Sequence, residues 1–451
     1  MPVSEPSGVT ITDGPCRSTS GAADDEALAR LQRIADPTTG IITGLRRVPV
    51  PPGEPGIQNY VVERADFAPL TDGNAMAHEE GGCAFSESDA RIAAYGEAVE
   101  RYCGCVFRRA QFHRSSYAEL ADPAVDPTAV VNFSATQRAS MAENRLCGPD
   151  DELSWVAGEN LASGATTYVP AQLVYLSYPP ESEPFIRNPV STGLAAGTSR
   201  AMAVHNGLAE VVERDAFITY YLTRTELPVI DLGTAPPRIR RLVDRVTAHG
   251  LELTVLDATT DLGVPVAIAV LVDRASRPAV TAAAAAGMDA TAVIESALEE
   301  VVQTRLWTIQ HLETTARDPA AVTPEEITDY EDRGLLWAAH DRISDLDFWV
   351  ESHRETTVDA FRASGTPDRN IVDRVTGSGY DCYAVDVTTR DISALGLTVQ
   401  KVVAPRLQPL YLVERLRYFG GDRLTWTPVE MGYRDEPPTE ADLHTVPHPF
   451  P

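Results

Sequence analysis

STGLAAGTSRAMAVHNGLAEVVERDAF, residues 191–217, is the stretch that decides the fold, because it joins a glycine-rich segment to a long, mostly apolar helix. Gly193 and Gly197 flank small residues, and Thr198 or Ser199 can cap the helix that follows. Backbone N–H groups point outward at a helix N-terminus, so such a segment can bind an anion. An ordinary glycine-rich connection has the same composition, and the segment alone leaves both interpretations open.

Acidic residues recur on three predicted helices, over residues 86–104, 201–222 and 289–312. Spacings of three and four residues place them on one face of each helix. Ser86 is a suitable N-cap for the first helix, and Gly104 is its expected end. The recurring residues are Glu97, Glu100 and Arg101 on the first helix, Glu210, Glu213 and Arg214 on the second, and Glu300 and Gln303 on the third.

A solvated helix surface is the simplest explanation of such a pattern, in which a Glu–Arg pair stabilises the helix by only ~0.2–0.5 kcal/mol. The neighbours argue against it, since mainly Ala, Val, Leu and Ile surround Glu97, Glu210 and Glu213. Buried carboxylates need partners because an unpaired buried charge is very costly. Acids outnumber arginines here, and carboxylate oxygens suit Mg²⁺ that is shared with phosphates.

The usual lysine-based phosphate motif is absent from the sequence. No G-x-x-x-x-G-K-[ST] occurs, and the chain contains one lysine, Lys401. If a nucleotide binds, arginine and metal ions must therefore neutralise its phosphates. This excludes a P-loop protein and a typical protein kinase.

Short β-branched segments alternate with the helices, which predicts an α/β or α+β fold with several lobes. Residues 1–34 are expected to be a loosely ordered N-terminal segment, and residues 35–451 the main domain. Its proline-rich tail, residues 446–451, cannot be helix or central strand. The predicted strands lie within residues 41–50, 59–65, 251–259, 264–273, 380–388 and 397–406.

Composition restricts the partners and the location. The formal net charge of -27 argues against nucleic acid and anionic membranes, which would repel the chain. No apolar stretch reaches the ~20 residues of a membrane span.

The start has no basic or apolar signal-peptide region, so we expect a cytoplasmic protein whose six cysteines are thiols. Zinc at Cys103 and Cys105 is the weaker alternative, since no second pair has suitable spacing. The shortage of lysine and the excess of acids fit a salt-adapted archaeon or a GC-rich bacterium.

Taken together in this order, these segments resemble the YcaO family, and within it the azoline-forming D-protein type. The resemblance runs from Ala35 to the last residue. Residues 191–217 and the ending PHPFP carry it most specifically. The segments RIAAYGEAVERYCG, SALEEVVQ and CYAVDVTTRDISALGLTVQKVVAPRLQPL agree in order and spacing.

The resemblance implies that ATP and Mg²⁺ bind between the three acidic helices. It assigns Glu97, Arg101, Asn206, Glu210, Arg214 and Gln303 to the nucleotide, and Glu100, Glu210, Glu213 and Glu300 to the metal. It also implies that the carboxylate of Pro451 reaches the site, where it would act as a base or orient the substrate. His205 is more simply a satisfied helix histidine than a proton shuttle.

Two departures from the family pattern concern cations. Where relatives often have Gly-Gly-Lys-Gly, this chain reads GGCAF, so Cys83 replaces the lysine, and Arg91 or another arginine is expected to compensate. Where many relatives have Pro-Gly-Leu, Arg406 follows Pro405 and is a candidate substitute.

The activity that the resemblance implies is ATP-dependent cyclodehydration of Cys, Ser or Thr in a ribosomally made precursor peptide. A leader-binding partner of the E1-like C-protein type would deliver the peptide, and a homodimer is expected. A YcaO-type thioamide-forming enzyme is the nearest alternative, although the PHPFP ending argues against it. A non-catalytic scaffold subunit is the other, which the presence of all three acidic sets disfavours.

Overall fold

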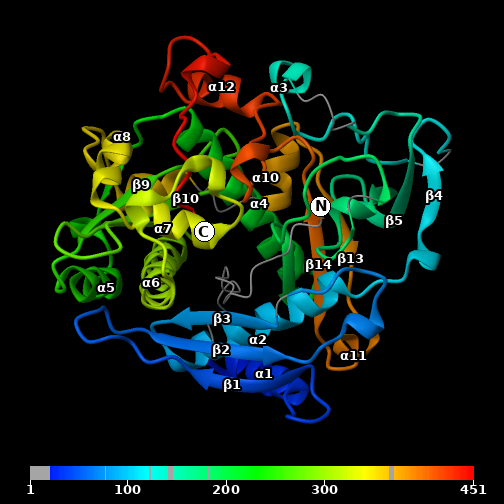
Figure 1. Ribbon diagram of the computed structural model, residues 1–451, viewed down its shortest axis with the longest axis horizontal. Helices are drawn as coiled ribbons and strands as arrows, with labels where there is room; N and C mark the ends of the chain where they lie inside the picture. Colours follow the sequence, from blue (N-terminus) through cyan, green and yellow to red (C-terminus); the bar gives the residue numbers. More distant parts are fainter. Residues whose placement is uncertain are drawn as a thin grey trace.

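The structure, a computed structural model, describes residues 21–76, 78–120, 123–140, 146–179, 182–364 and 370–450. Three β-sheets and the helices between them make up these residues (Figure 1). This confirms the predicted mixed α/β class. None of the described helices is long and apolar enough to cross a membrane.

The N-terminal sheet is antiparallel and consists of β1 (Ile42–Arg47), β2 (Gln58–Arg64) and β3 (Glu79–Ala84). Two helices, α1 (Gly21–Leu31) and α2 (Glu87–Cys105), lie next to it, below the rest of the molecule in Figure 1. The prediction of loose order over residues 1–34 is therefore wrong for residues 21–34, which form α1 and a short 3-10 turn. Leu31 and Ile34 are buried there against the α2 side of the sheet, and this apolar contact holds the segment. Residues 1–20 lie outside the described ranges.

The central sheet has the strand order β4-β5-β13-β14-β7, with β6 paired to β5, and all its pairs are antiparallel. Strands far apart in the sequence meet in it, since β7 and β14 lie side by side. The bounds are β4 (His113–Ser116), β5 (Glu152–Asn160), β6 (Thr166–Pro170), β7 (Leu194–Gly197), β13 (Tyr383–Asp386) and β14 (Thr398–Val403).

The outer sheet has the order β11-β10-β9-β8-β12 and is antiparallel except for the β8–β12 pair. Three of its strands, β8, β11 and β12, were not predicted, and for β11 the reason is that VTAAAAA has the composition of a helix rather than a strand. It is nevertheless strand β11, since β10 pairs with it along its full length. The bounds are β8 (Val229–Asp231), β9 (Glu252–Asp257), β10 (Val266–Val272), β11 (Val280–Ala286) and β12 (Glu355–Thr357).

The three predicted acidic helices are α2, α4 (Arg200–Leu222) and α6 (Ala290–Thr314). Each of them contacts two sheets: α2 the N-terminal and central sheets, α4 the central and outer sheets, and α6 the outer and N-terminal sheets. The three helices therefore occupy the three junctions between sheets. Ser86 and Ser199 cap α2 and α4 as predicted, and α2 ends one residue beyond Gly104.

Most of the remaining helices lie over the outer sheet or at the top of the molecule in Figure 1, whereas α11 lies at the lower right, between β13 and β14 in the sequence. They are α3 (Ala135–Ser140), α5 (Pro237–Thr247), α7 (Tyr330–Trp337), α8 (Asp347–Val350), α9 (Val358–Ser364), α10 (Ile371–Gly377), α11 (Arg390–Ser393) and α12 (Arg423–Glu430).

Candidate nucleotide and metal site

Acidic side chains of α2 and α4 meet at β7. The Glu100 carboxylate accepts a hydrogen bond from the Ala196 backbone N–H at 2.7 Å, and Glu97 forms an ion pair with Arg101 at 2.6 Å. Burial raises the pKa of Glu100 well above its ordinary value, and the negative charges of Glu97 and Glu210 raise it further. Carboxylates that disfavour each other's ionisation in this way gain from a cation placed between them.

On α4, the Glu210 carboxylate accepts a hydrogen bond from the Gly193 N–H at 2.9 Å. Arg214 forms ion pairs with both Glu210, at 3.5 Å, and Glu213. The Glu213 residue is only 3% exposed, which excludes the solvated-surface explanation for this helix. The glycine-rich segment therefore supplies backbone donors to the acidic helices.

The Asn206 amide indicates that this region is built for a ligand. Its Nδ2 and Oδ1 atoms are both buried, and neither has a hydrogen-bond partner within the described residues. Asn206 lies one turn before Glu210 on α4, and a spacing of four residues places both on one helical face. A buried amide without partners costs about 1–3 kcal/mol, and a ligand that bonds to it would remove this cost.

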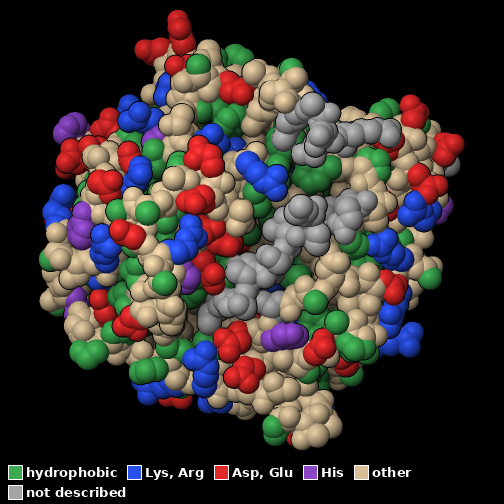
Figure 2. Space-filling model, viewed as in Figure 1, with side chains coloured by type: hydrophobic (Ala, Val, Ile, Leu, Met, Phe, Trp, Pro, Cys, Tyr) green, Lys and Arg blue, Asp and Glu red, His purple; other side chains and the backbone are tan. Residues whose placement is uncertain are grey.

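Helix α2 has an open space beside the buried Gly96, on the helical face that carries Glu100. Gly96 is buried, yet a Cβ at this position would meet no atom within 4 Å among the described contacts. Glu100 follows four residues later on the same helical face. Figure 2 shows Asp and Glu side chains gathered near the middle of the face, between the positions of α7 and α4 in Figure 1.

The third acidic helix, α6, has a contact with the N-terminal sheet that was not predicted, whereas the assignments of Glu300 and Gln303 stay predictions. Glu300 and Gln303 are buried on α6, at 9% and 4% exposure. The carboxylate that joins α6 to the N-terminal sheet belongs to Glu299, which accepts a hydrogen bond from the Phe85 N–H at 2.7 Å. Sequence reasoning passed over Glu299, although its place beside Glu300 in the EE pair was a usable signal.

Across the described ranges, no three His, Cys, Asp or Glu side chains are arranged as ligands of one metal ion. Mg²⁺ that is bound with a nucleotide commonly uses one or two carboxylates together with phosphate oxygens and water. The carboxylates of α2 and α4 fit this way of binding Mg²⁺ together with a nucleotide. The assignment of Glu100, Glu210, Glu213 and Glu300 to metal stays a prediction.

The C-terminal tail reaches the same helix. The Phe450 ring lies 4.2 Å from the Arg214 guanidinium, and its residue is 1% exposed. Tyr221 and Trp337 donate hydrogen bonds to the Pro447 carbonyl at 3.1 and 2.9 Å. Through these contacts the tail, up to Phe450, lies against the group formed by Glu210, Glu213 and Arg214. Pro451 lies outside the described residues, and its predicted catalytic role stays a prediction.

The structure describes other contacts for Cys83 and for the two arginines that were candidates to replace the family lysine. Cys83 is buried between β3 and α6, where its Sγ lies 3.6 Å from the Glu299 carbonyl. Arg406 is half exposed and pairs with Asp422 at 3.2 Å. Arg91 lies near Tyr60 of the N-terminal sheet, whose pKa it influences. Burial lowers the pKa of His205, which fits a neutral helix histidine. Arg101 and Arg214 are the arginines that form ion pairs with Glu97, Glu210 and Glu213.

The described cysteines are buried, which agrees with their interpretation as small core residues. These five cysteines form no disulfide with one another. Burial raises the pKa of the Cys103 and Cys382 thiols to about 12, so both are protonated at neutral pH.

A family model described as YcaO cyclodehydratase, ATP- and Mg²⁺-binding, matches residues 81–408 of this sequence. The chain belongs to the YcaO family. The match begins at β3 and includes all three acidic helices. The cofactors predicted from the resemblance, ATP and Mg²⁺, are those of the family description.

Similar proteins agree with this assignment. An uncharacterized protein of Methanothermobacter thermautotrophicus is 32% identical over 225 residues, which are 49% of this chain and 55% of that protein. A heterocyclase solved in complex with substrate and cofactor has a TM-score of 0.76 at 24% identity, covering 98% of this chain and 59% of its own. The YcaO protein of Methanopyrus kandleri, solved with AMPPCP and Mg²⁺, has a TM-score of 0.62 at 19% identity, covering 92% and 96%. The chain thus spans about half the length of this curated relative, and the solved structures establish the fold.

Proposed function

We propose that this YcaO-family protein is an ATP- and Mg²⁺-dependent cyclodehydratase that forms thiazoline or oxazoline rings in a ribosomally made precursor peptide. The observation that carries the proposal is the meeting of the α2 and α4 carboxylates at β7; α4 also carries Asn206, whose amide has no hydrogen-bond partner among the residues that the structure describes. The description of the family supports the same chemistry.

The reaction that we propose converts one amide into one ring. A Cys, Ser or Thr side chain of the peptide loses its proton and adds to the carbon of the preceding amide. The amide oxygen then takes the γ-phosphoryl group, and ADP leaves. Release of inorganic phosphate and of the amide proton leaves the C=N bond of the azoline. ATP with Mg²⁺ supplies the phosphoryl group that makes the amide oxygen a leaving group.

The residues of this chain would hold and orient the reactants. Arg101 and Arg214 place positive charge beside the carboxylates, where it can stabilise phosphate oxygens. Asn206 offers the N–H groups of Nδ2 as donors and Oδ1 as an acceptor to the nucleotide. Glu100 and Glu210, each fixed by a backbone N–H of the 193–197 segment, would bind Mg²⁺. Positioning and charge stabilisation supply most of the acceleration in such phosphoryl transfers.

A partner protein is part of the proposal, as the resemblance implies. We propose that a leader-binding protein of the E1-like C-protein type brings the precursor to this chain. The homodimer and the cytoplasmic location stay predictions.

The test combines nucleotide hydrolysis with mass spectrometry. Candidate precursor peptides are co-expressed with the protein and its candidate partner, and each ring is expected to lower the peptide mass by one water. ADP release should rise when the peptide is present and should fall to the background for Glu213→Ala. ADP release that survives this substitution would contradict the role of α4.

The same spectra separate the alternatives. Thioamide formation would replace one oxygen by one sulfur without loss of water. A scaffold subunit would leave both the peptide mass and the ADP release unchanged when Glu213→Ala replaces the wild type in the complex.

A further inference from the structure

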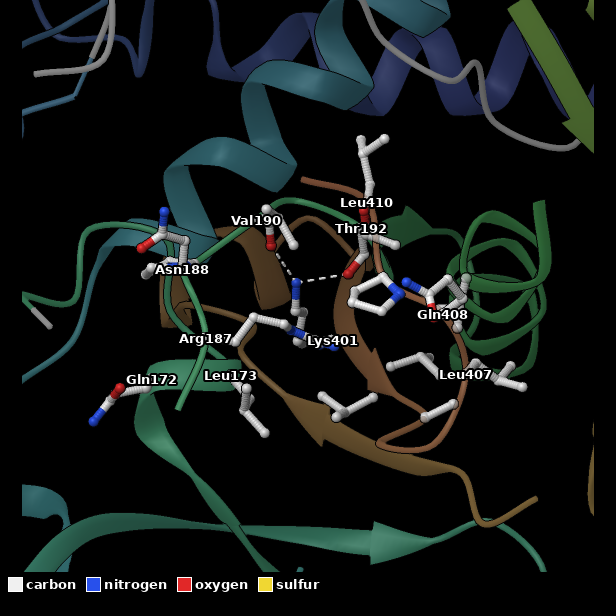
Figure 3. A pocket seen from close by; sticks show the side chains of 16 residues that line it. Gln172, Leu173, Arg187, Asn188, Val190, Thr192, Lys401, Leu407, Gln408 and Leu410 are labelled. Carbon is white, nitrogen blue, oxygen red and sulfur yellow. Dashed lines mark hydrogen bonds between the residues drawn. The ribbon is translucent and has the colours of Figure 1, made fainter. Parts of the chain in front are cut away.

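The single lysine of the chain is buried next to the proposed site. Lys401 lies on β14 and is 3% exposed, although lysine is almost never fully buried without a partner. Its ammonium donates hydrogen bonds to three consecutive carbonyls, as Figure 3 shows for two of them. The distances are 2.6 Å to Val190, 3.3 Å to Ser191 and 2.7 Å to Thr192.

The residues with these carbonyls directly precede Gly193. The backbone of Gly193 is hydrogen-bonded both to β14 and to a side chain of α4. The Gly193 carbonyl accepts a hydrogen bond from the Val402 N–H at 2.6 Å, and the Gly193 N–H donates to the Glu210 carboxylate at 2.9 Å. Gly193 has a φ of 87°, and a Cβ there would lie 2.1 Å from the Val402 carbonyl oxygen. Only glycine fits this position, and a shift of the preceding carbonyls would move its N–H relative to Glu210.

We infer that Lys401 is a positioning residue whose ammonium holds the carbonyls of residues 190–192, so that the Gly193 N–H fixes the Glu210 carboxylate for nucleotide and Mg²⁺. This inference rests on the proposed function. The lysine acts through the backbone, since an ammonium has three donors and the three carbonyls accept from them. It therefore differs from the phosphate-binding lysine of a P-loop.

The surroundings of Lys401 act on its charge in opposite directions, and the carbonyls around it need a donor. Burial lowers the pKa of Lys401 to about 7, with Arg187 and Arg101 acting in the same direction, while the negative charge of Glu210 opposes the shift. A cavity of about 30 Å³ next to the lysine is lined by Arg187 and Asn188, among others, and has room for about two water molecules. A neutral side chain of similar length would leave three converging carbonyls without their donor, which destabilises the turn.

The experiment compares Lys401→Met and Lys401→Arg with the wild type, using AMPPCP and Mg²⁺ as the probe in titration calorimetry. Arg374→Met is the matched control, because Arg374 is also a buried cation that donates to backbone carbonyls, at Ser364 and Gly263. It lies on α10, outside the carboxylate group. Melting temperatures of all four proteins are measured in parallel.

We expect Lys401→Met to weaken AMPPCP binding about 10–100-fold, as is usual when a residue that orients a metal ligand is lost. Lys401→Arg should recover part of the affinity, because it keeps charged donors near the carbonyls. Arg374→Met should lower the melting temperature and bind AMPPCP like the wild type. If Lys401→Met binds AMPPCP as tightly as the wild type, the inference is overturned and the proposed function stands. The same conclusion follows if Arg374→Met loses as much AMPPCP affinity as Lys401→Met. A wild-type protein that binds no AMPPCP with Mg²⁺ would overturn the proposed function and the inference with it.

A spectroscopic readout covers the case in which Lys401→Met does not fold. Because Lys401 is the only lysine, wild-type protein made with ¹³C-labelled lysine gives one lysine side-chain signal. AMPPCP with Mg²⁺ should shift this signal, since a metal at Glu210 changes the charge that faces the ammonium. A signal that stays in place while calorimetry records binding would overturn the inference.

Discussion

At the scale of single residues, the candidate site is a set of charges whose partners are mainly backbone groups and arginines. Glu100 and Glu210 each accept a backbone N–H from the segment before α4, while Arg101 and Arg214 pair with glutamates on their own helices. Asn206 departs from this rule, because its amide has no partner within the described residues. A bound nucleotide could supply the hydrogen bonds that this amide lacks.

The first prediction concerns Asn206. Asn206→Ala should leave the free energy of unfolding unchanged or raise it by about 1 kcal/mol, because it removes a buried amide without partners and introduces a better helix former. The affinity for AMPPCP with Mg²⁺ should fall about tenfold, which corresponds to about 1.4 kcal/mol. Urea denaturation and titration calorimetry measure the two quantities.

Asn370→Ala is the control with the opposite expectation. Asn370 caps α10 by accepting the Asp373 N–H at 2.9 Å, so its loss should cost about 1 kcal/mol of stability. The affinity for AMPPCP should not change. If Asn206→Ala loses stability as Asn370→Ala does and binds AMPPCP normally, Asn206 is a structural residue.

The sequence indicated most of these residues, but it did not indicate their partners. Apolar neighbours around Glu97 and Glu213 correctly predicted burial, because a helix with apolar residues on all sides cannot be solvated. That Gly193 would bind Glu210, and that Lys401 would bind the turn before it, depends on the pairing of β14 with β7. These strands are about 200 residues apart, and no local pattern encodes their register.

At the scale of elements, three helices with the same acidic signature lie at the three junctions between sheets. Their boundaries could be predicted, since Ser86, Ser199 and Asp289 are local caps that accept hydrogen bonds from the first turn. Strand β11 could not be predicted, because its alanines become a strand only by pairing with β10. Helix α1 was missed for a similar reason, since its order depends on packing against α2.

The second prediction concerns the C-terminal tail and pH. His448 is buried, and its Nε2 lies 2.9 Å from the Tyr411 carbonyl. Burial lowers the pKa of His448 well below its ordinary value, with Arg333 acting in the same direction. The unfolded chain therefore takes up a proton near pH 6.5 that the folded protein does not. Stability should be complete above this pH and should fall below it by about 1.4 kcal/mol per pH unit.

Denaturation between about pH 8 and about pH 5.5 tests this slope. His448→Gln keeps a donor for Tyr411 but does not titrate, so its stability should fall less steeply than that of the wild type. Part of the slope should remain, because burial also lowers the pKa of His444. His340→Gln, at an exposed position, should keep the wild-type slope. Equal slopes for His448→Gln and the wild type would mean that His448 accepts a proton in the folded state.

At the scale of the whole molecule, the chain has a large excess of negative charge, and its candidate site is also acidic. The sequence contains 65 Asp and Glu against 38 Lys and Arg. Many of the ion pairs are exposed, such as Arg46–Glu79 at 3.5 Å, and such pairs contribute only about 0–1 kcal/mol each. The family could be recognised from the order and spacing of segments in the sequence. The arrangement of three sheets with three helices at their junctions could be seen only in the structure.

The last prediction follows from this imbalance. Negative charges repel one another more strongly in the folded protein than in the expanded unfolded chain, so screening should stabilise the folded protein. Raising NaCl from about 0.05 M to about 0.5 M shortens the screening length from about 14 Å to about 4 Å. Because weak exposed ion pairs lose little, the net effect should be a rise in Tm of roughly 1 °C per kcal/mol of repulsion removed, since the entropy of unfolding is about 2.1 cal/mol/K per residue and the chain has 451 residues. Chloride is used because sulfate would stabilise the protein by exclusion from its surface. At about pH 5, where part of the carboxylates bind protons, the same salt series should raise Tm less. A Tm that falls with salt at neutral pH would mean that the ion pairs outweigh the repulsion of the 27 excess negative charges.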